Sequence, residues 1–260
     1  MMPNNGVFVF YFRNKNPQKD FRKDLFQIFK KSMADLQGIR KNITEMALVC
    51  TEKQFANLCA ADANMLKREY VRLDAKQVRG ELCGGVALGE MQPDSVAVIP
   101  FGCSAHYLSF LLCSLPGQLL LFGQKFNVLA KTTINKKAVS TLTVFDVSNE
   151  SEETYAMADL LRQEIYNFYR EKTDDMDYQR LYGLITDLCD VLALELYAHP
   201  LFEEKGVFIL ENWKAVLVKD TTKDKIAMAL TALTDSSSPL RNEIMKAHIL
   251  VQDVNDYIKK

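Results

Sequence analysis

Cys103 and His106 are the neighbouring side chains of this sequence best suited to metal or nucleophilic chemistry. A thiolate and an imidazole at this spacing form half of a tetrahedral zinc site, but no second pair follows at finger-like spacing. The sequence also lacks a G-x-S-x-G elbow, an H-E-x-x-H pair and a Cys/His nucleophile pattern. We therefore expect both residues to pack near the start of a helix, in a protein with no catalytic residue, metal or cofactor of its own.

A lysine-rich segment between residues 124 and 137 offers groups that bind polyanions, because it holds four lysines and no acid. Ammonium groups neutralise phosphates, hydroxyl and amide groups fix a protein on a duplex, and Asn can bind an adenine edge through two hydrogen bonds. On a loop these groups predict a nucleic-acid site, and a solvent-facing loop with ordinary lysines is the alternative. The residues concerned are Lys125, Lys131, Thr132, Thr133, Asn135, Lys136 and Lys137.

Charge is distributed unevenly along the chain, although the net charge is only −1. Residues 1–150 carry 19 Lys and Arg against 13 Asp and Glu, whereas residues 151–260 carry 13 against 20. Such asymmetry is typical of a polyanion-binding part joined to an acidic, protein-facing part. It is equally compatible with ordinary solvated surface, so charge alone does not decide the function.

Composition and cysteine usage indicate a cytoplasmic protein without membrane contact. No segment reaches the roughly 18 uncharged apolar residues of a membrane span, and the N-terminal MMPNNGVFVFYFRNK lacks a basic leader and a cleavage site. The cysteines have apolar neighbours and no framework spacing, which is typical of buried free thiols. They are Cys50, Cys59, Cys83, Cys103, Cys113 and Cys189.

Strand and helix patterns alternate in the first 150 residues. Thr51 and Gln54 have the spacing of a capping box, which predicts a helix from Thr51 to about Leu66. Glycines between residues 80 and 89 fit neither a dinucleotide fingerprint nor a P-loop, so we assign them to bulges and turns. We expect strands at 7–12, 46–50, 70–73, 95–100 and 138–147, and helices at 17–36, 51–66, 104–114 and 116–123.

Residues 151–260 are predicted to be entirely helical. A helix starting at Ser151 has acids in its first turn and an apolar stripe formed by Met157, Leu161, Ile165, Phe168 and Tyr169. A second helix at 177–197 has a similar stripe, so the two should form a hairpin, with shorter helices at 223–234, 238–247 and 251–258. We expect an α+β protein: a mixed α/β recognition domain over 1–150 and a helical spacer or docking region over 151–260.

Four segments between residues 107 and 165 occur in the order found near the end of a target-recognition domain. YLSFLLCS (107–114) and GQLLLFG (117–123) match its two short helices, INKKAVSTL (134–142) its strand entry, and EETYAMADLLRQEI (152–165) its closing helix. In this order they resemble the specificity subunits of type I restriction systems. ITDLCDVLALELY (185–197) and SSSPLRNEIM (236–245) similarly resemble C-terminal segments of TaqI-like and type IIG DNA methyltransferases.

The resemblance implies a non-catalytic protein that recognises a sequence in double-stranded DNA beside a separate adenine-specific methyltransferase or restriction subunit. A glycine-rich cofactor loop and an N-P-P-Y-like tetrapeptide are missing, so S-adenosylmethionine would bind the partner. The loop also departs from the family, since LAKT (129–132) stands where Gly-Thr or Gly-Ser is frequent. Two alternatives stay open: a protein-interaction scaffold without a nucleic-acid role, and an unrecognised enzyme around Cys103 and His106.

Overall fold

The chain forms two compact units, which the computed structural model describes over residues 40–74, 84–122, 134–147, 149–171, 176–218 and 221–258. The first, Gln37–Asp159, we call the sheet unit; the second, from Leu160 onward, we call the helical unit. Antiparallel sheets and many helices confirm the α+β class. The strand and helix expected at 7–12 and 17–36 lie outside the described residues. Among the helices described, none has the length and apolar character needed to cross a membrane.

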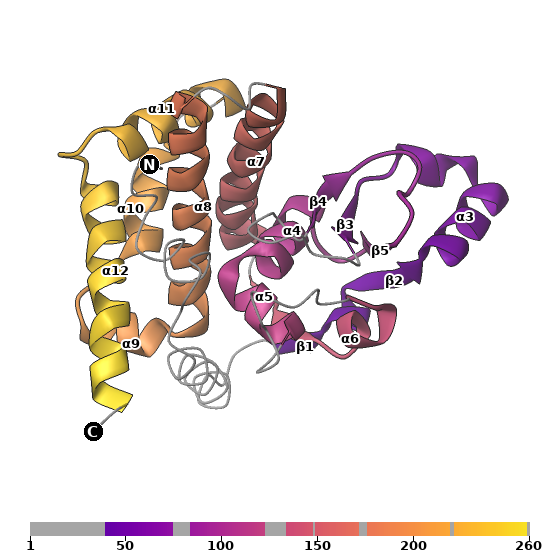
Figure 1. Cartoon of the computed structure of the whole chain (residues 1–260), viewed down its shortest axis with the longest axis horizontal. Coiled ribbons are helices and arrows are strands. Elements are labelled where there is room, and N and C mark those ends of the chain that lie inside the picture. Colours follow the sequence, from indigo (N-terminus) through magenta and orange to yellow (C-terminus); the bar gives the residue numbers. More distant parts are fainter. Residues whose placement is uncertain are drawn as a thin grey trace. The chain divides into compact units, whose positions relative to one another are not determined.

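A four-stranded antiparallel sheet, in the order β2-β5-β3-β4, organises the sheet unit (Figure 1). β2, β3 and β5 confirm the predicted positions, whereas β4 begins at the glycine pair of residues 84 and 85, which was assigned to bulges and turns: β2 Ala47–Thr51, β3 Tyr70–Asp74, β4 Gly84–Ala87 and β5 Ser95–Pro100. A Cβ atom on Gly84 would overlap the carbonyl oxygen of Arg72, so β4 needs glycine there. A separate pair joins β1 (Arg40–Asn42) to β6 (Thr143–Phe145).

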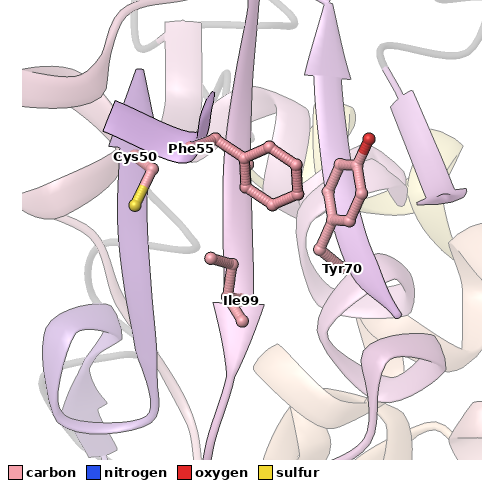
Figure 2. Packing of buried hydrophobic residues seen from close by; sticks show 5 residues of the cluster. Cys50, Phe55, Tyr70 and Ile99 are labelled. Carbon is pink, nitrogen blue, oxygen red and sulfur yellow. The ribbon is translucent and has the colours of Figure 1, made fainter. Parts of the chain in front are cut away.

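The side chains of each strand alternate between the two faces of the sheet, and the central strands β3 and β5 are buried on both. Cys50, Tyr70 and Ile99 share one face and pack with Phe55 of α3 (Glu52–Ala61), as Figure 2 shows. The alternate residues, including Val71, belong to the other face, and α4 (Ala105–Cys113) packs against β3, β4 and β5. A central strand buried on both faces explains why residues 96–100 of β5 are all apolar.

Capping residues set the ends of the helices beside the sheet. Thr51 and Gln54 form the predicted capping box of α3, with the Gln54 amide N–H donating to Thr51 Oγ1. The helix ends at Ala61 rather than Leu66, because Asp62 caps a new 3₁₀ turn, η2 (Ala63–Lys67). A first 3₁₀ turn, η1 (Ile43–Glu45), precedes β2.

The predicted strand over 138–147 is wrong in its first half. Residues before Thr141 form a short helix, α6 (Lys136–Ser140), and only β6 is extended. Val139 and Leu142 are three residues apart, a spacing that fits one helical turn, and Asn135 supplies the cap. The expected helices at 104–114 and 116–123 are confirmed as α4 and α5 (Leu115–Phe122).

α8 (Met176–Tyr197) is the centre of the helical unit and confirms the predicted helix at 177–197. Residues 191–195 are buried in succession, so α8 is covered all round rather than along one stripe. It packs against α9 (His199–Glu204), α10 (Ile209–Val216), α11 (Thr222–Thr234) and α12 (Pro239–Ile258). The rings of Tyr166 and Tyr182 lie 5.7 Å apart, so α7 (Asn149–Glu171) meets α8 as a hairpin predicts.

Three details of the helical part differ from expectation. α7 starts at Asn149 instead of Ser151, and its predicted stripe includes Phe168, whose side chain is 50% exposed. The two helices expected at 238–247 and 251–258 are the single helix α12, because no Gly or Pro interrupts residues 240–258. α9 and α10 were not predicted, since each is shorter than the window over which helical periodicity can be read.

Candidate functional site

Three of the seven predicted nucleic-acid contacts fall within the described residues, and they lie together at the start of α6. Asn135 and Lys137 are exposed, and Lys136 is half-buried between them. The other four lie outside the described residues: Lys125, Lys131, Thr132 and Thr133. The segment is therefore not a loop throughout, because its last two lysines belong to a helix.

Asn135 has a structural role of its own. Its Oδ1 accepts a hydrogen bond from the Ala138 amide at 2.9 Å and so caps α6. A bidentate contact with adenine requires both Oδ1 and Nδ2 of an asparagine. In Asn135 the cap already fixes the direction of Oδ1, which would have to accept a second hydrogen bond from the base, so a phosphate or sugar contact suits this residue better than direct base readout.

Lys136 connects α6 to the start of α3. Its Nζ donates to Oε1 of Gln54 at 2.8 Å, and the same Gln54 oxygen accepts from the Thr51 amide. Lys53, which the sequence pattern did not single out, is exposed on the first turn of α3. Lys53, Lys136 and Lys137, which we call the lysine cluster, therefore flank one junction between α3 and α6.

The lysine cluster is poor in compensating charge. No ion pair joins any of its three members to a described acidic residue, and the sequence contains no Asp or Glu from Ser95 to Phe145. The sheet unit as a whole is balanced, with 12 Lys and Arg against 13 Asp and Glu over residues 37–159. Attraction for a polyanion must therefore be local to this cluster rather than a property of the unit's net charge.

A second polar group lies in the interior of the sheet unit, where α4 meets α7. Asp159 is fully buried, and its two carboxylate oxygens each lie 2.9 Å from a partner, Oδ1 from Ser109 Oγ and Oδ2 from His106 Nδ1. A buried carboxylate beside an imidazole nitrogen fixes the orientation of the ring, as in histidines that act in proton transfer. His106 is therefore held by a specific partner, which corrects its interpretation as a residue that only packs among apolar neighbours.

Cys103 is unsuited to be the nucleophile of such a site. Burial, with smaller contributions from the carboxylates of Glu152 and Asp146, raises the pKa of its thiol to about 12. Only the thiolate attacks or binds metal, so at neutral pH this sulfur is inert. Glu152 also accepts a hydrogen bond from the Ser104 amide at 2.7 Å. Across the described ranges, no three His, Cys, Asp or Glu side chains are grouped so that they could hold a metal ion.

The helical unit has an open apolar pocket of about 430 Å³ between α10, α11 and α12. Ala215, Ala227 and Met228 are typical of its lining. Its polar groups are engaged within the fold, since Thr231 Oγ1 donates to the Ala227 carbonyl and Asp235 accepts from Ser237. The pocket offers shape and apolar surface but no reactive group.

Comparison with known proteins yields no match: no protein-family model, curated protein or solved structure is similar to this chain. Function must therefore be inferred from the residues themselves.

Proposed function

We propose that this protein recognises a DNA sequence through its sheet unit and acts beside a separate adenine-specific DNA methyltransferase or restriction subunit. The lysine cluster at the α3–α6 junction carries the proposal, because its cations are near the surface, lack described acidic partners and continue the lysine-rich segment that ends there. Lys53 and Lys137 are the two fully exposed members. Phosphate contacts of this kind hold a protein in register on a duplex.

Chemistry is assigned to a partner chain in this proposal. The thiol of Cys103 is protonated at neutral pH, and no motif of the sequence binds S-adenosylmethionine. The ordered motifs between residues 107 and 165 support the same division, since they resemble a specificity subunit and not the catalytic subunit. Binding of S-adenosylmethionine by the isolated chain would contradict this part of the proposal.

The salt dependence of duplex binding tests the role of the lysine cluster. Each phosphate contact contributes about 0.9 to the slope of log affinity against log salt concentration. Replacing Lys53, Lys136 and Lys137 with Ala should therefore flatten the slope by up to about 2.7, whatever the DNA sequence. Lys205→Ala and Lys214→Ala remove exposed lysines of the helical unit and serve as matched controls that should leave the slope unchanged. A protein that retains no duplex at low salt, alone or with its methyltransferase, would overturn the proposal.

A protein-interaction scaffold is the second candidate, and the pocket between α10, α11 and α12 favours it. Introducing a charge by Ala227→Glu should abolish capture of a protein partner if this pocket mediates it, while leaving DNA binding intact. Truncating the chain at Asn149 is a poorer test than this substitution. That cut deletes Asp159, which is a buried residue of the sheet unit bound to His106 and Ser109.

A further inference from the structure

α10 begins without a capping side chain of its own. Its N-cap residue, Phe208, makes no side-chain hydrogen bond to the first turn. Two glutamates from distant helices take over this role: Glu195 of α8 accepts from the Leu210 amide at 2.7 Å, and Glu243 of α12 accepts from the Phe208 amide at 2.9 Å. The start of α10 is thus held by two carboxyl oxygens, which accept from amides that the helix itself leaves without a partner.

The two carboxyl groups are buried together, which places like charges in a medium of low polarity. Glu195 is 4% exposed and Glu243 is 8% exposed. The pKa of Glu195 is raised to about 7, mainly by burial and less by Glu243 and Glu211, against hydrogen bonds from the Leu210 and Ile209 amides that lower it. Lys246 Nζ donates to Glu243 Oε1 at 2.5 Å.

Other titratable groups near this pair do not account for a proton that is lost near neutral pH. On α12, burial lowers the pKa of His248 to about 4, so that ring is already neutral. On α9, His199 and Glu203 are exposed to solvent. α11 contributes Lys223, Asp224 and Lys225, none of which acts on the Glu195 carboxyl, and Arg241 at the start of α12 donates to the last carbonyls of α11.

We propose that Glu195 and Glu243 form a pH-sensitive clamp on the first turn of α10, closed while Glu195 is protonated and loosened when Glu195 ionises. Ionisation places a negative charge in a buried site beside the Glu243 carboxyl, where burial and repulsion between like charges both disfavour it. Opening the first turn lets water reach Glu195 and relieves that repulsion. The clamp is independent of the proposed DNA contact, because all its residues belong to the helical unit.

The consequences of loosening are confined to one side of the helical unit. α10 carries Trp213, which is fully buried and is the only tryptophan of the chain. The same helix supplies Asn212, Ala215 and Val216 to the apolar pocket. A loosened α10 would therefore alter both the environment of Trp213 and one wall of the pocket.

Amide hydrogen exchange of the full-length protein, read by mass spectrometry over peptides covering residues 206–216, tests the clamp. After correction for intrinsic exchange, protection should fall by about tenfold for each pH unit between about 5 and 7 and then level off, because opening returns Glu195 to its ordinary pKa. Peptides from α11 and from α4 should show no such dependence and serve as internal controls. A pH-independent protection of residues 206–216 in the wild type would overturn the proposal.

Variants identify the responsible carboxyl. Glu195→Gln keeps an oxygen for the Leu210 amide but cannot ionise, so its protection should be flat with pH. Glu243→Gln removes the like charge, so the protection of residues 206–216 should level off at a lower pH than in the wild type. This variant keeps the test decisive if Glu195→Gln does not fold. His199→Gln should behave as the wild type. Acrylamide quenching of Trp213 gives a second readout. The clamp would be refuted if amide protection in Glu195→Gln fell with pH as steeply as in the wild type and protection in Glu243→Gln levelled off at the wild-type pH.

Discussion

Breaking the buried pair of His106 and Asp159 should destabilise the sheet unit far more than breaking an exposed ion pair. Asp159 has no exposed surface. Its carboxylate accepts a hydrogen bond from Ser109 Oγ at 2.9 Å and lies 2.9 Å from His106 Nδ1. Asp159→Ala leaves two polar groups without this acceptor and opens a small cavity. His106→Ala leaves a buried carboxylate without its imidazole. The double variant removes both partners together, so the four proteins form a double-mutant cycle.

The expected magnitudes follow from the burial of the pair. Leaving a buried polar group without its partner costs about 1–3 kcal/mol, and a hydrogen bond to a charged group contributes about 1.5–3 kcal/mol. We therefore expect Asp159→Ala, which also opens a cavity, to cost about 3 kcal/mol and the coupling energy to be about 2 kcal/mol. Asp159→Asn should cost only about 1 kcal/mol, because an amide can accept from Ser109 and donate to the other tautomer of His106.

The assay must follow the sheet unit alone, since the single tryptophan lies in the helical unit. Cys50 and Cys113 are buried in the sheet unit and Cys189 in the helical unit, so thiol labelling at increasing denaturant resolves the two units. Loss of protection should appear at Cys50 and Cys113. A cycle on Lys41 and Asp146, whose side chains are 43% and 24% exposed, is the control and should show much weaker coupling. Coupling at His106–Asp159 no larger than in that control would refute the reasoning.

Three further predictions concern stability, and thermal and chemical unfolding can check them. Gly84→Ala should cost about 2 kcal/mol or more because its Cβ overlaps the Arg72 carbonyl, whereas Gly102→Ala, with its nearest neighbour 3.9 Å away, should change stability by less than about 0.5 kcal/mol; equal effects would contradict this. Thr51→Ala should cost about 1 kcal/mol by removing the α3 cap, and no loss would mean that the cap is dispensable. Glu195 has a pKa of about 7 in the fold against an ordinary 4.5, so its contribution to the free energy of unfolding is present below pH 4.5 and is lost as pH rises to 7. The helical unit should lose at most about 3 kcal/mol of stability over that range. The Glu195→Gln variant should lose none of it.

Local chemistry made much of the sheet unit predictable. The capping box at Thr51 and Gln54 places the start of α3, and apolar runs bounded by glycines or polar residues place β2, β3 and β5. The helix α6 was missed because Val139, Leu142 and Val144 satisfy a helical turn and a strand about equally well. The deciding contact is the Asn135 cap, and Asn also suits a polar loop, so composition could not separate the two.

The lysine cluster and the buried carboxyl groups show two different limits of sequence reasoning. Cations in an acid-free segment can be selected without a fold, but Lys53 joins them only because α3 begins beside α6. Glu195 lies within the apolar stretch of residues 191–196, and an acid in a buried stretch requires partners because an isolated buried charge is too costly. That requirement could have marked Glu195, whereas Asp159 lies off the apolar stripe of its helix and gave no such signal. Their partners could not be named, since Asp159 meets a histidine 53 residues away and Glu195 meets the start of another helix.

The position of these acids bears on how the molecule is divided. An acidic helical stretch begins at Ser151, so composition predicts a boundary near residue 150. Composition does not indicate which unit supplies the hydrogen-bond partners of a buried group. Asp159 is buried with His106 and Ser109, so the first turns of α7 are part of the sheet unit's interior. A fragment ending after Asp159 should therefore retain the protection of Cys113 that a fragment ending at Asn149 loses. Comparing thiol protection in the two fragments checks this directly, and equal protection would show that Asp159 is not needed to complete the unit.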